Sequence, residues 1–279
     1  MSDWSIPGSM GRGIIGTTHE PGDHGGLHVL LAHGFKGYKD YGFIPWLAET
    51  IAQAGHVAHR FNFSHGGMGH GHGSFDEAAF QEDTWNRQVD DIMTLLASVQ
   101  EGVLPGGKAS SILLAGHSRG GATCLLAGGR HAGEEVLESL CGIVTLAAPS
   151  ACLRMSEEDQ DRLLVEGRLP SPSSRTEQVL HVGASWLSEQ LDDPGGHDLL
   201  SLAGRIPVPV HVIHGMLDDA VPVEDAGEIA DATGRAGEAI LIEGSNHVFN
   251  TPNPFSPEQP PSPALQELGD VLIGIAGRR

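Results

Sequence analysis

A serine stands at the centre of a G-x-S-x-G pattern in the stretch LLAGHSRGGA, where Gly116 and Gly120 flank Ser118. The apolar run SSILLA precedes this serine, and GGATCLLAGG, which is compatible with a helix, follows it. Small flanking residues permit a strained turn from strand to helix that projects a serine hydroxyl from the top of a sheet. The pattern predicts that Ser118 is a nucleophile, and an ordinary serine in a Gly-rich turn is the alternative.

A serine hydroxyl is a poor nucleophile unless a neighbouring base removes its proton, so a histidine and an orienting carboxylate are required. The stretch VHVIHGMLDDAVP supplies Asp218 and Asp219 after one strand-like run, and ILIEGSNHVF supplies His247 after the last. The resulting chain order of serine, aspartate and histidine is the one expected when all three follow strands of such a sheet. We predict Ser118, Asp218 and His247 as the catalytic residues, with Asp219 as the fallback for the acid.

The negative charge that develops on a substrate carbonyl oxygen needs two hydrogen-bond donors, which backbone N–H groups usually supply. The N–H of Arg119, directly after the nucleophile, is one candidate. The N–H of Phe35 is the other, because Gly34 and Gly37 leave its loop free to turn inward. We interpret His33, in the same loop, as a structural hydrogen-bonding residue rather than a base.

These residues must be positioned by alternating strands and helices. Near-continuous runs of Val, Ile, Leu and Ala predict strands that are covered on both faces. The predicted strands are GIIGTT and the ranges 28–34, 56–63, 110–117, 141–149, 208–215 and 238–244. Apolar residues at three- and four-residue steps predict helices at 44–54, 84–99, 119–131, 223–233 and 264–276. The alternation predicts an α/β fold with a doubly wound, mostly parallel sheet, in which ligands bind beyond the carboxyl ends of the strands.

The alternation breaks between residues 150 and 204, which are too many for an ordinary connection. We expect a helical cap inserted there into a core formed by residues 1–149 and 205–279. Met155–Gly167 is predicted as a helix capped by Ser156 and Asp159, Arg168–Ser174 as a Pro/Ser-rich link, and Thr176–Asp193 as a second helix. Apolar residues of the cap, Trp186 among them, are candidates for lining a substrate pocket, and packing within the cap is the alternative.

The composition excludes several classes of protein. The 279 residues include 16 Lys and Arg against 36 Asp and Glu, a formal net charge of −20, which disfavours binding to nucleic acid or to anionic membranes. No apolar run is long enough for a membrane helix, and the first residues do not resemble a signal peptide, so we expect a cytoplasmic protein. The three cysteines follow no metal-ligand spacing and are interpreted as buried reduced thiols. The oligomeric state stays open, with a homodimer as one option.

A histidine-rich stretch, RFNFSHGGMGHGHGSF, places His70 and His72 among glycines. A metal site needs three or four ligands in fixed geometry, and no cysteine or well-placed carboxylate completes a set here. We therefore predict no metal and interpret the stretch as a loop at the rim of the pocket. Replacing His70 and His72 with alanine should change substrate preference while Ser118 stays reactive, whereas a complete loss of activity that metal restores would contradict this.

Several motifs appear in order: LLAHGFKGYKDYGFIPWLAETIAQAG, RFNFSHGG, LAGHSRGG, VIHGMLDDAVPVEDA and IEGSNHVF. With them the chain resembles the α/β-hydrolase superfamily, and within it the capped bacterial serine hydrolases of the esterase and acyl-peptidase-like group. The resemblance implies Ser118 as nucleophile, His247 as base, Asp218 as orienting acid, and the amides of Phe35 and Arg119 as the oxyanion hole. We expect a carboxylesterase that acts on small-molecule esters without a cofactor. A peptidase or amidase, a thioesterase, a perhydrolase, a non-catalytic ligand receptor and a metal-handling protein are the alternatives.

Overall fold

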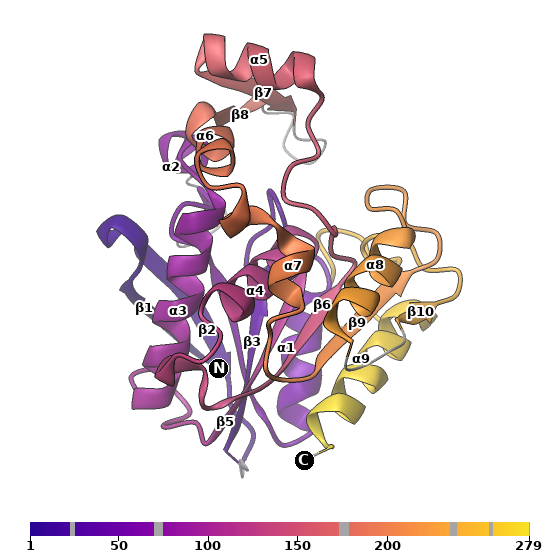
Figure 1. The fold of residues 1–279 in the computed structure, drawn as a ribbon. Helices are drawn as coiled ribbons and strands as arrows, with labels where there is room; N and C mark the ends of the chain where they lie inside the picture. The colour runs from indigo at the N-terminus through magenta and orange to yellow at the C-terminus, as the bar shows by residue number, and fades with distance from the viewer. Residues whose placement is uncertain (23–25, 70–74, 173–178, 235–238, 257–258, 279) are drawn as a thin grey trace.

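The computed structural model describes residues 1–22, 26–69, 75–172, 179–234, 239–256 and 259–278. An eight-stranded sheet crosses the molecule, with strand order β1-β2-β4-β3-β5-β6-β9-β10 (Figure 1). Its strands are β1 (Ser2–Pro7), β2 (Gly13–His19), β3 (Leu27–Ala32), β4 (Val57–Asn62), β5 (Ser111–His117), β6 (Leu140–Leu146), β9 (Val210–Gly215) and β10 (Ile240–Ile242). The strands from β4 to β10 in this order pair in parallel, while β1 and β2 pair antiparallel at one edge. The predicted α/β fold with a mostly parallel sheet is confirmed.

Helices cover both faces of the sheet, so the central strands are apolar on both sides. On one face, α1 (Ile44–Gln53) and α9 (Pro263–Ala276) pack against Val29 and Leu31 of β3. On the other face, α3 (Trp85–Glu101), α4 (Arg119–Arg130) and α8 (Glu224–Thr233) pack in the core cluster that contains Leu30. The predicted strands and the five predicted helices are confirmed with shifts of a few residues at their ends. A short helix, α2 (Glu77–Gln81), begins after Asp76, whose side chain accepts a hydrogen bond from the Ala79 N–H.

The edge strand β1 was not predicted from the sequence. Its residues alternate between partly buried and exposed, which fits an edge strand with one face on the protein. The stretch SDWSIP has too few apolar residues to distinguish such a strand from a loop. In its pairing with β2, Trp4 lies opposite Gly16. The indole Nε1 of Trp4 donates a hydrogen bond to Thr18 Oγ1 at 2.9 Å, which holds the two strands in this register.

The segment from 150 to 204 holds α5 (Glu157–Glu166), β7 (Arg168–Pro172), β8 (Val179–Gly183), α6 (Ala184–Asp192) and α7 (Leu199–Ala203). In Figure 1 the first four lie together above one end of the sheet, and α7 lies against the body of the molecule. Leu163, Leu169 and Leu187 form a small core of their own. Leu199 and Leu202 of α7 belong instead to the main core. The division of the chain into a core and a cap stays a prediction.

The expectation of two helices joined by a Pro/Ser-rich link is wrong in part, because β7 and β8 form an antiparallel two-stranded sheet. A single helix over Thr176–Asp193 is therefore excluded, and α6 begins only at Ala184. Both strands of a two-stranded sheet are edges, so Pro170 and Pro172 can stand in β7. The predicted N-terminal capping of α5 is confirmed, since Ser156 Oγ accepts a hydrogen bond from the Asp159 N–H at 3.2 Å.

Hydrogen bonds of α6, β8 and β7 are among those that fasten the insertion to the rest of the chain. Glu189 of α6 accepts a hydrogen bond from the Trp85 N–H at 2.6 Å, at the start of α3. His181 of β8 lies 2.7 Å from Glu77 of α2, between Nδ1 and Oε1. Lys36 Nζ donates to the Pro172 carbonyl at 2.7 Å. Each contact joins the insertion to a segment at the same end of the sheet.

Two smaller expectations concern the burial of the cysteines and the lack of a membrane helix. All three thiols are free, and Cys124 and Cys152 are buried as expected, but Cys141 is exposed. Cys141 stands near the start of β6, where the strand emerges from the core, so the expectation that all three are buried is wrong. Over the described ranges, every helix is too short or too polar to cross a bilayer.

Candidate active site

Ser118 occupies a strained turn between β5 and α4. Its backbone has φ 52° and ψ −124°, a region that L-residues rarely adopt, and its N–H donates to the Leu146 carbonyl at 2.8 Å. A Cβ on Gly120 would lie 2.5 Å from the His33 carbonyl oxygen, and one on Gly116 would lie 2.6 Å from the Gly121 nitrogen. The two glycines are needed because backbone packs against backbone, which is the physical meaning of the G-x-S-x-G pattern.

His247 and Asp218 meet although 29 residues separate them in the chain. His247 Nδ1 lies 2.8 Å from Asp218 Oδ2, and the Asp218 side chain is fully buried while that of His247 is 18% exposed. The other carboxylate oxygen, Oδ1, accepts from the N–H groups of Ala220 and Val221 at 2.9 and 2.8 Å. The neighbouring Asp219 is exposed. The structure thus places Asp218, and not the fallback residue, against the imidazole.

A second histidine, His214, holds the same carboxylate and was missed from the sequence. Its Nε2 lies 3.2 Å from Asp218 Oδ2 and 3.1 Å from the Val221 carbonyl, and its side chain has no exposure. Burial alone would raise the pKa of Asp218, but the hydrogen bonds from His214, His247 and Val221 together hold it well below its usual range. Asp218 therefore stays ionised. The signal for His214 is its place on β9, four residues before the aspartate.

His117, directly before Ser118, is a third histidine at this site and was also missed. Its Nε2 donates to the His247 carbonyl oxygen at 2.9 Å, and the two rings lie 4.8 Å apart between centroids. Burial, with a smaller contribution from His247, lowers the pKa of His117 to about 3. The ring is neutral, so with Nε2 as the donor its Nδ1 carries no proton. His117 thereby fixes the backbone of the residue proposed as the base.

The candidates for the oxyanion hole flank Ser118 from two segments. Arg119 is the first residue of α4, where the N–H groups lack acceptors within the helix. Phe35 belongs to the loop after β3, which approaches Ser118 so closely that a Cβ on Gly34 would lie 2.9 Å from Ser118 Cβ. His33 in this loop hydrogen-bonds the Gly34 carbonyl through Nδ1, and its Nε2 accepts from the Phe63 N–H at 3.4 Å. The interpretation of His33 as a structural residue is confirmed.

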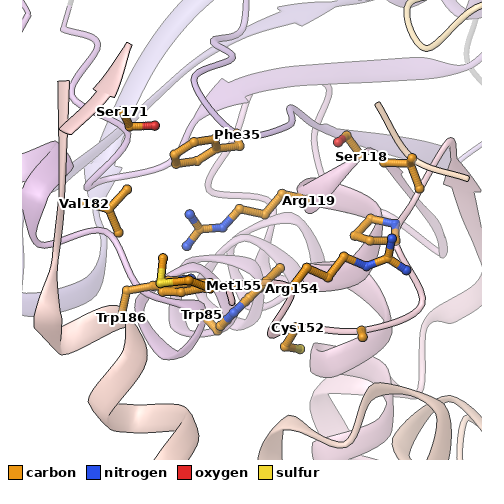
Figure 2. A pocket seen from close by; sticks show the side chains of 13 residues that line it. Phe35, Trp85, Ser118, Arg119, Cys152, Arg154, Met155, Ser171, Val182 and Trp186 are labelled. Carbon is orange, nitrogen blue, oxygen red and sulfur yellow. The ribbon is translucent and has the colours of Figure 1, made fainter. Parts of the chain in front are cut away.

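Two cavities open at Ser118. The smaller, of 160 Å³, is lined by His247, Phe35, Tyr41 and their neighbours. The larger, of 470 Å³, lies between the sheet end and the insertion and is lined by Phe35, Trp85, Ser118, Arg119, Pro149, Ala151, Cys152, Arg154, Met155, Ser171, Val182, Trp186 and Val221 (Figure 2). Trp186, predicted as a pocket residue, does line it. Leu163 and Leu187, two other apolar residues of the segment predicted as a cap, are fully buried in the small core of the insertion, so for them the packing alternative holds.

The histidine-rich loop is only partly described. His70 and His72 lie outside the described residues, so their prediction as pocket-rim residues stays a prediction. His65, at the start of the loop, is buried, and its Nδ1 lies 2.9 Å from Ser64 Oγ. Burial lowers its pKa to about 4. Within the part of the chain that the structure covers, no three His, Cys, Asp or Glu side chains gather as metal ligands.

Comparison with known proteins supports the fold through structure rather than sequence. Neither protein-family models nor curated sequences match the chain. A putative hydrolase from Agrobacterium vitis S4 is similar with a TM-score of 0.74 at 18% identity, covering 98% of each chain. Est1E from Butyrivibrio proteoclasticus gives 0.69 at 14% identity over 99% of this chain and 98% of its own, and mouse alpha/beta hydrolase domain-containing protein 10 gives 0.70 at 18% over 99% and 98%. The chain therefore has the α/β-hydrolase fold.

Proposed function

We propose that the protein is a serine carboxylesterase that hydrolyses small to medium esters through an acyl-serine intermediate. One observation carries the proposal: His247 is hydrogen-bonded to the buried carboxylate of Asp218 and lines the same cavity as Ser118. Acyl transfer requires a nucleophile, a base and an orienting acid, and Ser118, His247 and Asp218 are the candidates for these roles. The esterases among the similar structures, Est1E included, agree with it.

In the proposed reaction, Ser118 Oγ attacks the ester carbonyl carbon while His247 Nε2 takes the hydroxyl proton. The N–H groups of Phe35 and Arg119 bind the oxyanion of the tetrahedral intermediate. His247 then gives the proton to the departing alcohol, which leaves the acyl group on Ser118. Water enters, His247 takes its proton, and collapse of the second intermediate releases the acid and restores the serine. Asp218 holds the imidazole in the tautomer that presents a lone pair at Nε2, and no cofactor takes part.

Reaction with a fluorophosphonate tests the nucleophile. We expect covalent labelling at Ser118, complete loss of labelling in Ser118→Ala, and retained labelling in Ser171→Ala. Ser171 is the matched control because it lines the larger cavity but stands on β7, away from the strained turn. Folded protein that does not react would favour the alternative of a non-catalytic ligand receptor.

The type of bond cleaved is tested with nitrophenyl esters of increasing acyl length beside an aminoacyl anilide. The larger cavity, with walls from Phe35, Trp85 and Trp186, accommodates a medium or aromatic group. One similar structure, with a TM-score of 0.72 at 16% identity, is Est1E with bound ferulic acid, so the nitrophenyl ester of an aromatic acid belongs in the panel. We expect ester turnover to dominate. Rapid anilide cleavage with little ester turnover would instead assign an amidase or peptidase.

A further inference from the structure

The side chain of Arg119 forms part of the wall of the larger cavity, in addition to the candidate role of its backbone. Figure 2 shows the guanidinium reaching away from Ser118 into the space between Phe35 and Trp85. Its Cζ lies 4.7 Å from the centroid of the Trp85 ring and 5.6 Å from that of Phe35. The side chain is only 9% exposed. The two rings hold a buried positive charge at a fixed place beside the nucleophile.

The guanidinium has donors without acceptors. Nη1 lies 3.3 Å from Asp83 Oδ2, whereas Nε and Nη2 have no hydrogen-bond partner among the described residues. Trp85 is another residue of the cavity wall, and its buried indole Nε1 has no hydrogen-bond partner in the described chain either. A buried donor without an acceptor is costly, and more so on a charged group. Three such donors on two stacked residues of one cavity wall indicate a ligand that brings acceptors.

Asp83, the carboxylate beside Arg119, contacts only Nη1 of its guanidinium. Its two carboxylate oxygens accept from Gln88 Nε2 at 3.1 and 2.8 Å, and Gln88 in turn accepts from Thr123 Oγ1 at 2.8 Å. Asp83 is therefore held in place independently of Arg119. Burial raises the pKa of Asp83, because the charged carboxylate is disfavoured away from water. The contact at 3.3 Å engages only Nη1 and leaves the Nε and Nη2 edge of the guanidinium without a partner among the described residues.

We propose that Arg119 is a carboxylate-binding residue of the larger cavity and that the substrates are esters carrying a free carboxylate. Nε and Nη2 lie along one edge of the planar guanidinium and present two parallel N–H bonds, which match the two oxygens of a carboxylate. The apolar and aromatic walls accommodate the chain that joins this carboxylate to the ester. This inference rests on the proposed esterase function, since it places the carboxylate at the far end of a substrate whose carbonyl lies at Ser118.

The negative net charge of the protein makes a preference for anionic esters informative. A protein with a formal net charge of −20 repels anionic substrates at a distance. A preference for an anionic ester over a neutral one must therefore arise from local contacts. Arg154, a second cation of the cavity, is paired through Nη2 with Asp225 and with Ser150 Oγ, and its side chain is 38% exposed. The side chain of Arg119 is 9% exposed and holds two buried nitrogens without a hydrogen-bond partner among the described residues.

The test compares nitrophenyl hydrogen adipate, pimelate and suberate with neutral nitrophenyl esters of matched length. These chains are long enough that the free carboxylate does not cleave its own ester through a small-ring anhydride. We expect kcat/KM of the wild type to be about tenfold to a hundredfold higher for the acidic esters, the range of a hydrogen-bonded charge pair. Arg119→Met should abolish this ratio, and Arg119→Lys, which keeps the charge but loses the planar fork, should lose most of it. Arg278→Gln removes one positive charge at the other end of the sheet and should keep the ratio.

The outcomes separate this inference from the proposed function. Ester turnover and fluorophosphonate labelling without any preference for the acidic esters would overturn the carboxylate site and leave the esterase intact. The absence of both labelling and turnover would overturn the esterase itself. If the Arg119 variants do not fold, the wild-type ratio and competitive inhibition decide: adipate should inhibit hydrolysis of a neutral ester more strongly than hexanoate, and equal inhibition would refute the site.

Discussion

Replacing Asp218 with asparagine tests how the site orients its imidazole. The carboxylate accepts two backbone N–H groups at Oδ1 and two histidine rings at Oδ2. An amide has one oxygen, so either the backbone donors or the imidazoles meet an N–H instead of an acceptor. If the oxygen stays with the backbone, His247 turns its unprotonated nitrogen toward the amide. Its Nε2 then carries the proton and cannot serve as the base.

We expect Asp218→Asn to lower kcat about a thousandfold to ten-thousandfold, which corresponds to about 4–5.5 kcal/mol of transition-state stabilisation. The loss of a charge-assisted hydrogen bond should also lower the free energy of unfolding by about 1.5–3 kcal/mol. Nitrophenyl ester kinetics and urea unfolding measure the two effects separately. Asp219→Asn is the matched control, because this exposed neighbour should leave kcat within about twofold. A drop of less than tenfold for Asp218→Asn, or a larger one for Asp219→Asn, would refute the reasoning.

Three other predictions concern the turn, the buried histidines and stability in acid. Gly120→Ala should abolish activity and destabilise the fold, because its Cβ would press against the His33 carbonyl oxygen, whereas Gly227→Ala, in open space on α8, should raise stability by about 0.5–1 kcal/mol in thermal unfolding. His117→Phe keeps a ring but removes the donor to the His247 carbonyl, so kcat should fall about tenfold with little change in KM, and unchanged kcat would contradict the positioning role. Burial lowers the pKa values of His59 and His117 to about 3, so their contribution to stability is complete above pH 6.5 and is lost as the pH falls toward 3. Each histidine should lower the free energy of unfolding by about 2 kcal/mol at pH 5. Asp91, whose pKa burial raises to about 6, offsets part of this loss. A free energy of unfolding in denaturant that is the same at pH 5 and at pH 7.5 would contradict this prediction.

Much of the framework is predictable from the sequence because parallel strands are apolar on both faces. Such runs are visible without knowledge of tertiary contacts, and the residues that follow them must gather at one end of the sheet. Ser118, Asp218 and His247 were therefore located from their order and their place after strands. The preference for Asp218 kept Asp219 as a fallback, since both follow the same strand and only the packed structure buries one of them against the imidazole.

Other features were not predictable because their signals are not local. The two-stranded sheet of β7 and β8 contains two prolines, and its strands pair only with each other. The sequence therefore indicated a link over Arg168–Ser174 and a helix over Thr176–Asp193 instead. His214 and His117 are two of 16 histidines, and only their partners, a carboxylate and a carbonyl brought from elsewhere in the chain, distinguish them. A pattern search finds residue types at spacings, whereas these roles depend on which groups lie within hydrogen-bond distance.

Arg119 illustrates the same limit at one position. The sequence predicts a use for its backbone N–H, because any residue after the nucleophile has that group at the start of a helix. The use of its side chain depends on Trp85 at the start of α3 and on Phe35 after β3, which stack on the guanidinium only in the folded protein. Any side chain would supply the N–H of the proposed oxyanion hole. The proposed chemistry at Ser118 therefore does not require an arginine at position 119. A buried arginine with unpaired donors is better explained by a ligand that the cavity binds.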